Sequence, residues 1–169
     1  MQITAVSLLL GSLLLVASAQ DQKPDAVGAI DAALSKAAAE NRRVLLVWET
    51  EESEPSRRLH ELFAKNEEVR QKLLYEYDVV HADAGRDADI AQRYHVDASQ
   101  VPVLTVLDAK GVALANQPAS ALANDPQQLL AFLAQHQAPY PKAEDVRQRA
   151  LADAKAAGKR LFLTFGAPW

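Results

Sequence analysis

Short apolar runs that alternate with amphipathic segments most constrain what this chain can fold into. Residues 43–48 (RVLLVW) and 103–107 (VLTVL) are short, apolar and rich in β-branched residues, as is typical of buried strands. Residues 25–41 place apolar side chains on one helical face, which predicts an amphipathic helix before the first strand. Strands that alternate with helices indicate an α/β fold, in which helices pack on a central sheet.

The remaining patterns complete the order αβαβαββα. Residues 108–111 (DAKG) predict a turn that joins the last two strands as an antiparallel hairpin. Apolar spacing predicts a helix after Pro55 that carries Leu59, Leu62 and Phe63, and Val69, Leu73 and Leu74 either extend this helix or form a further turn behind it. It also predicts helices at 87–94 and around 129–133. Two further strands are predicted at 77–80 and 112–115. We therefore expect an α/β sandwich with a mixed sheet over residues 20–137.

Composition excludes several classes of function. The 169 residues include 18 Lys plus Arg against 22 Asp plus Glu, a formal net charge of -4, which argues against a nucleic-acid partner. The chain has no cysteine, so it cannot form disulfides, use a thiolate nucleophile, or build a cysteine zinc site or an iron–sulfur cluster. No motif points to a cofactor, and we expect none.

The first residues predict a targeting segment. Residues 3–19 are apolar apart from one threonine, three serines and one glycine, and they end in Ala17-Ser18-Ala19, a small-residue cleavage signature. Residues 1–19 are therefore predicted to be a signal peptide that is removed after Ala19. An uncleaved membrane anchor would need about 20 apolar residues, and this run is shorter and contains serines. We expect an exported protein, periplasmic or extracellular, with no membrane contact after cleavage.

The helix–strand pattern starts again after residues 138–142 (APYPK), where two prolines indicate a linker. A shift of 117 positions aligns residues 24–52 with 141–169 and gives eight identities over 29 positions, at Pro24, Ala26, Ala33, Leu34, Ala37, Ala39, Arg43 and Leu46. Proline, helix, basic residue and apolar run recur in the same order. We therefore predict that residues 143–169 are the opening helix and strand of a truncated second copy.

The end of this second copy carries a family resemblance. Its predicted strand runs into residues 166–169 (GAPW), and this segment resembles the approach to the active site in thioredoxin-like proteins, where a Cys-x-x-Cys motif follows at a helix N-terminus. Under the 117-residue shift, the two cysteine positions fall on Ser53 and Ser56. Residues 20–137 are thus similar to a thioredoxin-like domain in which Ser53, Glu54, Pro55 and Ser56 form a degenerate active-site loop. The resemblance implies a thioredoxin-like α/β sandwich.

The degenerate loop implies a redox-inactive domain. Disulfide exchange needs a thiolate that attacks sulfur, and a serine hydroxyl cannot replace it. A buried Asp that the family often has six positions before the first cysteine is Val47 here. Four glutamates near Ser53 would also raise the pKa of a thiol: Glu49, Glu51, Glu52 and Glu54. The alternative interpretation of residues 53–56 is a plain helix cap.

A second segment extends the resemblance. Val101-Pro102 is similar to the cis-proline segment of the family, which faces the active-site loop and binds extended chains, so the resemblance implies an extended peptide or protein as partner. We expect an exported, redox-inactive thioredoxin-like protein that is a fragment of a thiol–disulfide oxidoreductase-like protein. The alternative is a non-catalytic peptide-binding or structural module. No residue of this chain is expected to be catalytic, and whether the parent protein is an enzyme stays open.

The histidines give no metal signature in the sequence. His60, His81, His95 and His136 show neither H-x-x-x-H nor H-E-x-x-H spacing. We therefore expect four surface or half-buried histidines and no metal site. Trp48, at the end of a predicted strand, is expected to be a core residue rather than a platform for a ligand.

Overall fold

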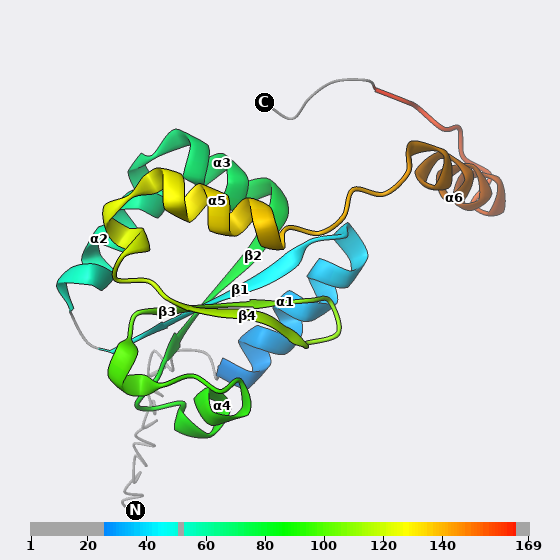
Figure 1. Ribbon diagram of the computed structural model, residues 1–169. Coiled ribbons are helices and arrows are strands. Elements are labelled where there is room, and N and C mark those ends of the chain that lie inside the picture. Colours follow the sequence, from blue (N-terminus) through cyan, green and yellow to red (C-terminus); the bar gives the residue numbers. More distant parts are fainter. Residues whose placement is uncertain (1–25, 51–52, 165–169) are drawn as a thin grey trace, which may run out of the picture.

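The computed structural model describes residues 26–50 and 53–164, and a mixed four-stranded sheet lies at its centre (Figure 1). The strand order is β2-β1-β3-β4. Strand β1 (Arg43–Glu49) pairs in parallel with β2 (Tyr77–Asp83) and antiparallel with β3 (Val103–Leu107). Strand β3 in turn pairs antiparallel with β4 (Ala113–Pro118). The predicted α/β architecture with a mixed sheet is confirmed.

Helices cover both faces of the sheet, as Figure 1 shows. The helices are α1 (Ala26–Glu40), α2 (Glu54–Lys65), α3 (Glu67–Glu76), α4 (Ala88–Arg93) and α5 (Pro126–His136), with short 3-10 turns η1 (Ala98–Gln100) and η2 (Leu122–Asn124). The alternation of side chains along β1 separates two cores. Leu45 and Val47 belong to the core under α2, α3 and α5, whereas Leu46 and Trp48 belong to the core on the side of α1 and α4.

The apolar pattern after Pro55 forms two helices, because Asn66 interrupts it. The backbone N–H of Asn66 donates to the Leu62 carbonyl at 3.0 Å and closes α2. Its side-chain oxygen accepts a hydrogen bond from the Val69 N–H at 3.0 Å and caps α3. One residue therefore ends one helix and begins the next.

The last strands differ from their predicted bounds. β2 runs to Asp83 rather than Val80, because all seven of its residues pair in register with β1. β4 lies at residues 113–118 rather than 112–115, and register shifts where it joins β3 near Leu107. Pairing, rather than local apolar character, sets these limits: most of β4 is exposed.

Helix α6 (Ala143–Ala156) extends away from the sheet, and none of its residues is buried (Figure 1). The 117-residue shift carries the first residue of α1 onto the first residue of α6, so the predicted helix is present. The predicted strand is not: residues 159–164 have no strand structure in the described part of the chain. A strand needs a neighbour for its backbone hydrogen bonds, and no strand of the described residues lies beside this segment.

The segment predicted to be a linker is fastened to the domain over its first half. Ala138 is buried, and the side chain of Asn41 donates to the Pro139 carbonyl at 2.9 Å. The hydroxyl of Tyr140 donates to the Glu76 carboxylate at 3.1 Å. Residues 138–140 are thus held against the domain, whereas Pro141 and Lys142 make no side-chain hydrogen bond to it among the described residues.

The predicted signal peptide, residues 1–19, lies outside the described residues, as do residues 51–52 of the loop after β1. Within the described ranges, no helix has the length and apolar character needed to cross a membrane.

Candidate functional site

The two serines of the degenerate loop meet at the N-terminus of α2. Ser53 is the N-cap residue, and its hydroxyl accepts a hydrogen bond from the Ser56 N–H at 3.2 Å. The hydroxyl oxygens of Ser53 and Ser56 lie 2.7 Å apart and share a hydrogen bond. Pro55 occupies the first turn, where a missing N–H carries no cost. The segment is thus a helix cap, and the two serines adjoin each other at that cap.

The charges beside this loop are partly neutralised by neighbours. Glu54 forms ion pairs with Arg58 at 2.7 Å and with Arg57 at 2.9 Å. The hydrogen bond from Arg58, followed by the charges of both arginines, lowers the pKa of Glu54. Glu49 is turned toward two histidines, described below. Glu49 and Glu54 therefore contribute less negative charge near Ser53 than the sequence suggests. The other two glutamates, Glu51 and Glu52, lie outside the described residues.

The segment Val101–Pro102 lies at the same end of the sheet as the serine loop. Trp48 pairs with Val103 across the antiparallel strands, so the start of β3 lies beside the end of β1. The Val101–Pro102 peptide bond is cis, as the resemblance implies. Pro102 is buried and its carbonyl accepts a hydrogen bond from the Ala119 N–H at 2.7 Å. Val101 is partly buried and packs against the core on the α1 and α4 side of the sheet.

The residues beneath the loop are apolar core. Val47, at the position of the family's buried acid, is fully buried. Trp48 is also fully buried, and its indole Nε1 donates to the Thr105 hydroxyl at 3.0 Å. The expectation that Trp48 is a core residue is confirmed. No ionisable side chain occupies either position, so neither can relay a proton to the loop.

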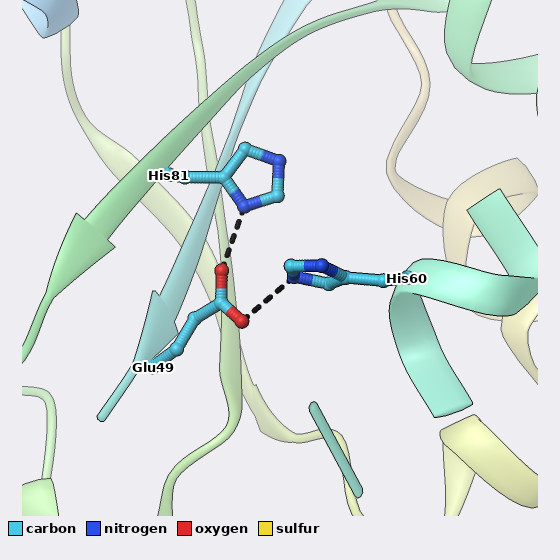
Figure 2. Close-up of side chains that lie close together, drawn as sticks. All are labelled: Glu49, His60 and His81. Carbon is cyan, nitrogen blue, oxygen red and sulfur yellow. Dashed lines mark hydrogen bonds and ion pairs between the residues drawn. The ribbon is translucent and has the colours of Figure 1, made fainter. Parts of the chain in front are cut away.

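A third group of polar side chains lies beside the loop, and Figure 2 shows that its members point toward one another. Glu49 lies at the end of β1, and each of its carboxylate oxygens is within hydrogen-bond distance of one histidine. One oxygen lies 2.7 Å from His81 Nδ1, and the other lies 2.8 Å from His60 Nε2. The imidazole rings lie edge to face, with centroids 5.2 Å apart. The three come from β1, α2 and β2. A surface hollow of about 550 Å³ adjoins them.

The surroundings of Glu49 stabilise its charged form. Burial is the largest single influence and opposes ionisation, but the hydrogen bonds from His81 and His60 and the attraction of both imidazoles together outweigh it, so the pKa of Glu49 lies below its usual value. Only 17% of the Glu49 side chain is exposed, against 51% for His60 and 44% for His81. The histidines are therefore surface residues, as expected, around a mostly covered carboxylate.

Sequence reasoning did not bring these three residues together. Val47 pairs with His81, and Glu49 is two residues further along the same face of β1. That register is not visible in the sequence, and the strand predicted at 77–80 stops before His81. If each predicted strand is extended by one residue, the alternation of side chains places Glu49 and His81 on the face of the sheet that α2 covers. That extension is the sequence signal for this pair.

Comparisons with known proteins bear on the family and the fold of the chain. The family model described as thioredoxin-like matches residues 25–109, just over half of the chain. A disulphide isomerase from Xylella fastidiosa Temecula1 has a similar structure, with a TM-score of 0.56 and 21% identity over 69% of this chain and 95% of that one. A thioredoxin from Thermus thermophilus matches with a TM-score of 0.49 and 18% identity over 61% and 82% of the two chains. No curated protein sequence matches the chain.

A mixed β2-β1-β3-β4 sheet with helices on both faces, and a helix N-terminus at the end of β1, define a thioredoxin-like domain. The family match establishes the same from the sequence, and the chain belongs to the thioredoxin-like family. The likeness to the isomerase, at 21% identity, shows the shared fold. The chain has no cysteine, so it lacks the thiols that disulfide exchange requires.

Proposed function

We propose that this chain is an exported thioredoxin-like protein whose complete domain is redox-inactive and holds an extended peptide segment without reacting with it. The observation that carries the proposal is the pair of serine hydroxyls, 2.7 Å apart at the N-terminus of α2. They occupy the two positions at which the family resemblance places a redox pair. The helix N-terminus is retained, and the thiols are replaced.

The replacement removes the chemistry but leaves the surface. Disulfide exchange proceeds through a mixed disulfide, which requires a thiolate and a sulfur–sulfur bond. A serine hydroxyl does not ionise usefully near neutral pH and forms no exchangeable bond to sulfur. The end of β1 and the start of β3, by contrast, still lie side by side, with Trp48 opposite Val103. The partly buried Val101 lies next to that edge.

A peptide-capture measurement tests this binding role. The probe is a fluorescent, reduced and alkylated unfolded peptide, whose anisotropy is followed as untagged chain is added. We expect saturable binding that V101K weakens by about tenfold or more, because a buried or half-buried lysine beside the peptide resists desolvation. V112K is the matched control, since Val112 is 55% exposed and lies in the turn at the opposite end of β3.

Three outcomes would overturn the peptide-binding role: no saturable binding by the parent chain, equal weakening by V112K, or unchanged binding by V101K. Circular dichroism and thermal melts establish that both variants are folded. Reduction of insulin by the parent chain is expected to equal the uncatalysed rate, because the chain has no thiol.

We also propose that the chain is part of a tandem thioredoxin-like, thiol–disulfide oxidoreductase-like protein, with any thiol chemistry in its second copy. Supporting this, α6 starts at the residue onto which the 117-residue shift carries the first residue of α1. The correspondence is incomplete, since Ile30, which is buried in α1, falls on Arg147. Sequencing the source transcript beyond the codon for Trp169 tests the proposal. A following Cys-x-x-Cys supports it, and an immediate stop codon contradicts it.

Export is tested separately by the mature N-terminus. Expression with the complete leader, followed by intact-mass analysis of the secreted or periplasmic protein, is expected to give a chain that begins at Gln20. Replacing Ala17 and Ala19 with bulky residues is the control that should block removal, since cleavage depends on small residues there. A chain that keeps Met1 in the cytoplasm would contradict export.

A further inference from the structure

Three side chains of the types that bind metal ions converge beside α2 from three separate elements. Their ligand atoms are a carboxylate oxygen of Glu49 and one ring nitrogen each of His60 and His81, and these atoms all lie within 4.8 Å of one another. Figure 2 shows the two imidazoles directed at opposite oxygens of one carboxylate. Sequence spacing gives no sign of this group, because 11 residues separate Glu49 from His60 and 32 separate Glu49 from His81.

We propose that Glu49, His60 and His81 form a binding site for a divalent late first-row transition-metal ion of the Zn²⁺ type. Two imidazoles and one carboxylate are a common protein ligand set for Zn²⁺ when a fourth position stays open. The set contains too few oxygen ligands for Ca²⁺, which takes six to eight. It also has no thiolate or thioether, the ligands that select Cu⁺.

The separations between ligands suit insertion of an ion. In a tetrahedral site with bonds of about 2.0–2.1 Å, neighbouring ligand atoms lie about 3.3 Å apart. One carboxylate oxygen of Glu49 lies 2.7 Å from His81 Nδ1 and the other lies 2.8 Å from His60 Nε2, and one ligand atom from each of the three residues lies within 4.8 Å of the other two. Side-chain adjustments of about 0.5–1.5 Å therefore bring one oxygen and two ring nitrogens to tetrahedral spacing. An ion would then replace the two hydrogen bonds by three coordinate bonds, one from each residue, and the fourth position would stay open.

The two histidines have the freedom to make this adjustment. About half of each of their side chains is exposed, 51% for His60 and 44% for His81, and each is attached to a regular element, α2 or β2. The backbone is thus fixed while the rings can turn. Glu49, by contrast, is 17% exposed and supplies a charge held in place, which favours a cation between the rings.

The hollow beside the cluster leaves room for a fourth ligand. Phe63 and Ala64 on α2 line it together with the three polar side chains, so one wall is apolar and the other carries the ligand atoms. The fourth position would be taken by water or by a small donor from solution. The site is separate from the serine pair, which has a role in the proposed function that does not depend on metal.

Isothermal titration of the untagged chain with ZnCl₂ in a non-coordinating buffer tests the site. We expect one ion to bind per chain. E49Q, H60N and H81N should each weaken binding by about tenfold or more, since even residues that only support metal ligands change affinity by about 10- to 100-fold. H95N is the matched control: His95 is exposed, follows α4 on the other face of the sheet, and has a positive φ of 57° that asparagine tolerates.

Two further readouts separate a lost ligand from a lost fold. Circular dichroism of each variant without metal should match the parent, because the cluster lies at the surface. The thermal midpoint should rise with added Zn²⁺ in the parent and H95N, and should rise less in the three cluster variants at the same Zn²⁺ concentration. Co²⁺ in place of Zn²⁺ should give the intense visible absorption of a tetrahedral site.

The proposal fails if the parent binds no Zn²⁺ with one-to-one stoichiometry. It also fails if any of E49Q, H60N and H81N binds as the parent does, or if H95N weakens binding as much as they do. Each of those results would leave the cluster as a pair of surface hydrogen bonds to one carboxylate. None of them bears on the peptide-binding role, whose probe contains no metal.

Discussion

The serine pair at the start of α2 predicts that a redox pair can be restored there. In the S53C/S56C variant, the only two sulfurs capable of exchange replace hydroxyl oxygens that lie 2.7 Å apart. A disulfide bond is about 2.05 Å long, so closure requires the two atoms to approach by about 0.7 Å, which small side-chain rotations supply. We expect air or oxidised glutathione to convert the variant fully to the intramolecular disulfide.

The stability difference follows from the size of the ring. Residues 53–56 close a loop of four residues, for which the chain-entropy relation gives about 2 kcal/mol in favour of the oxidised form. Both redox forms have lost the hydroxyl that caps α2, a change of about 1 kcal/mol, so this loss cancels when the oxidised form is compared with the reduced form. For a domain of this size, 2 kcal/mol corresponds to a rise in thermal midpoint of roughly 8 °C.

The assays are thiol titration, thermal melts with and without dithiothreitol, and insulin reduction. We expect no titratable thiol after oxidation, a higher midpoint for the oxidised form, and measurable insulin reduction by S53C/S56C. The S53C variant alone is the control, because it can form only intermolecular disulfides. Two free thiols that persist under oxidising conditions, or an oxidised form with the lower midpoint, would refute the inference that Ser53 and Ser56 occupy redox-pair geometry.

Two further predictions concern the sheet and its hairpin. T105V removes the hydroxyl that accepts a hydrogen bond from the buried Trp48 indole at 3.0 Å. It should lower the free energy of unfolding, measured by urea denaturation, by about 1–3 kcal/mol. T105S keeps the hydroxyl and should lose less stability, and equal losses in the two variants would contradict this. Hydrogen bonds from the Val112 N–H, and then from the Lys110 N–H, lower the pKa of Asp108 despite its partial burial. Its contribution to stability is therefore complete above the unfolded pKa of about 3.9 and is lost as pH falls through the lower folded value; D108N should flatten the acid limb of stability against pH, and an unchanged limb would contradict the assignment.

The buried strands were the most predictable part of the fold. The bounds of β3 match the apolar run 103–107, and β1 exceeds its predicted run by one residue, because burial on both faces leaves a continuous apolar signal. β4 was predicted less well, since an exposed edge strand is defined by its partner rather than by its own residues. The same reason explains why residues 159–164 lack the predicted strand.

The candidate sites divide in the same way. Ser53 and Ser56 are three residues apart at a helix start, so their proximity follows from local geometry that a sequence displays. Glu49, His60 and His81 meet only because β1 and β2 pair in one particular register and α2 covers that face. A shift of one residue in that register would turn His81 to the opposite face. Long-range register is what the sequence does not reveal.

The fastening of the chain after α5 has a consequence for rotational diffusion. Asn41 and Glu76 hold Pro139 and Tyr140 by hydrogen bonds, which leaves two residues before α6. Two residues span at most about 7 Å, much less than the diameter of a domain. A folded body attached through α6 would therefore tumble largely together with the sheet rather than as an independent bead, and its orientation would be sampled within a narrow cone.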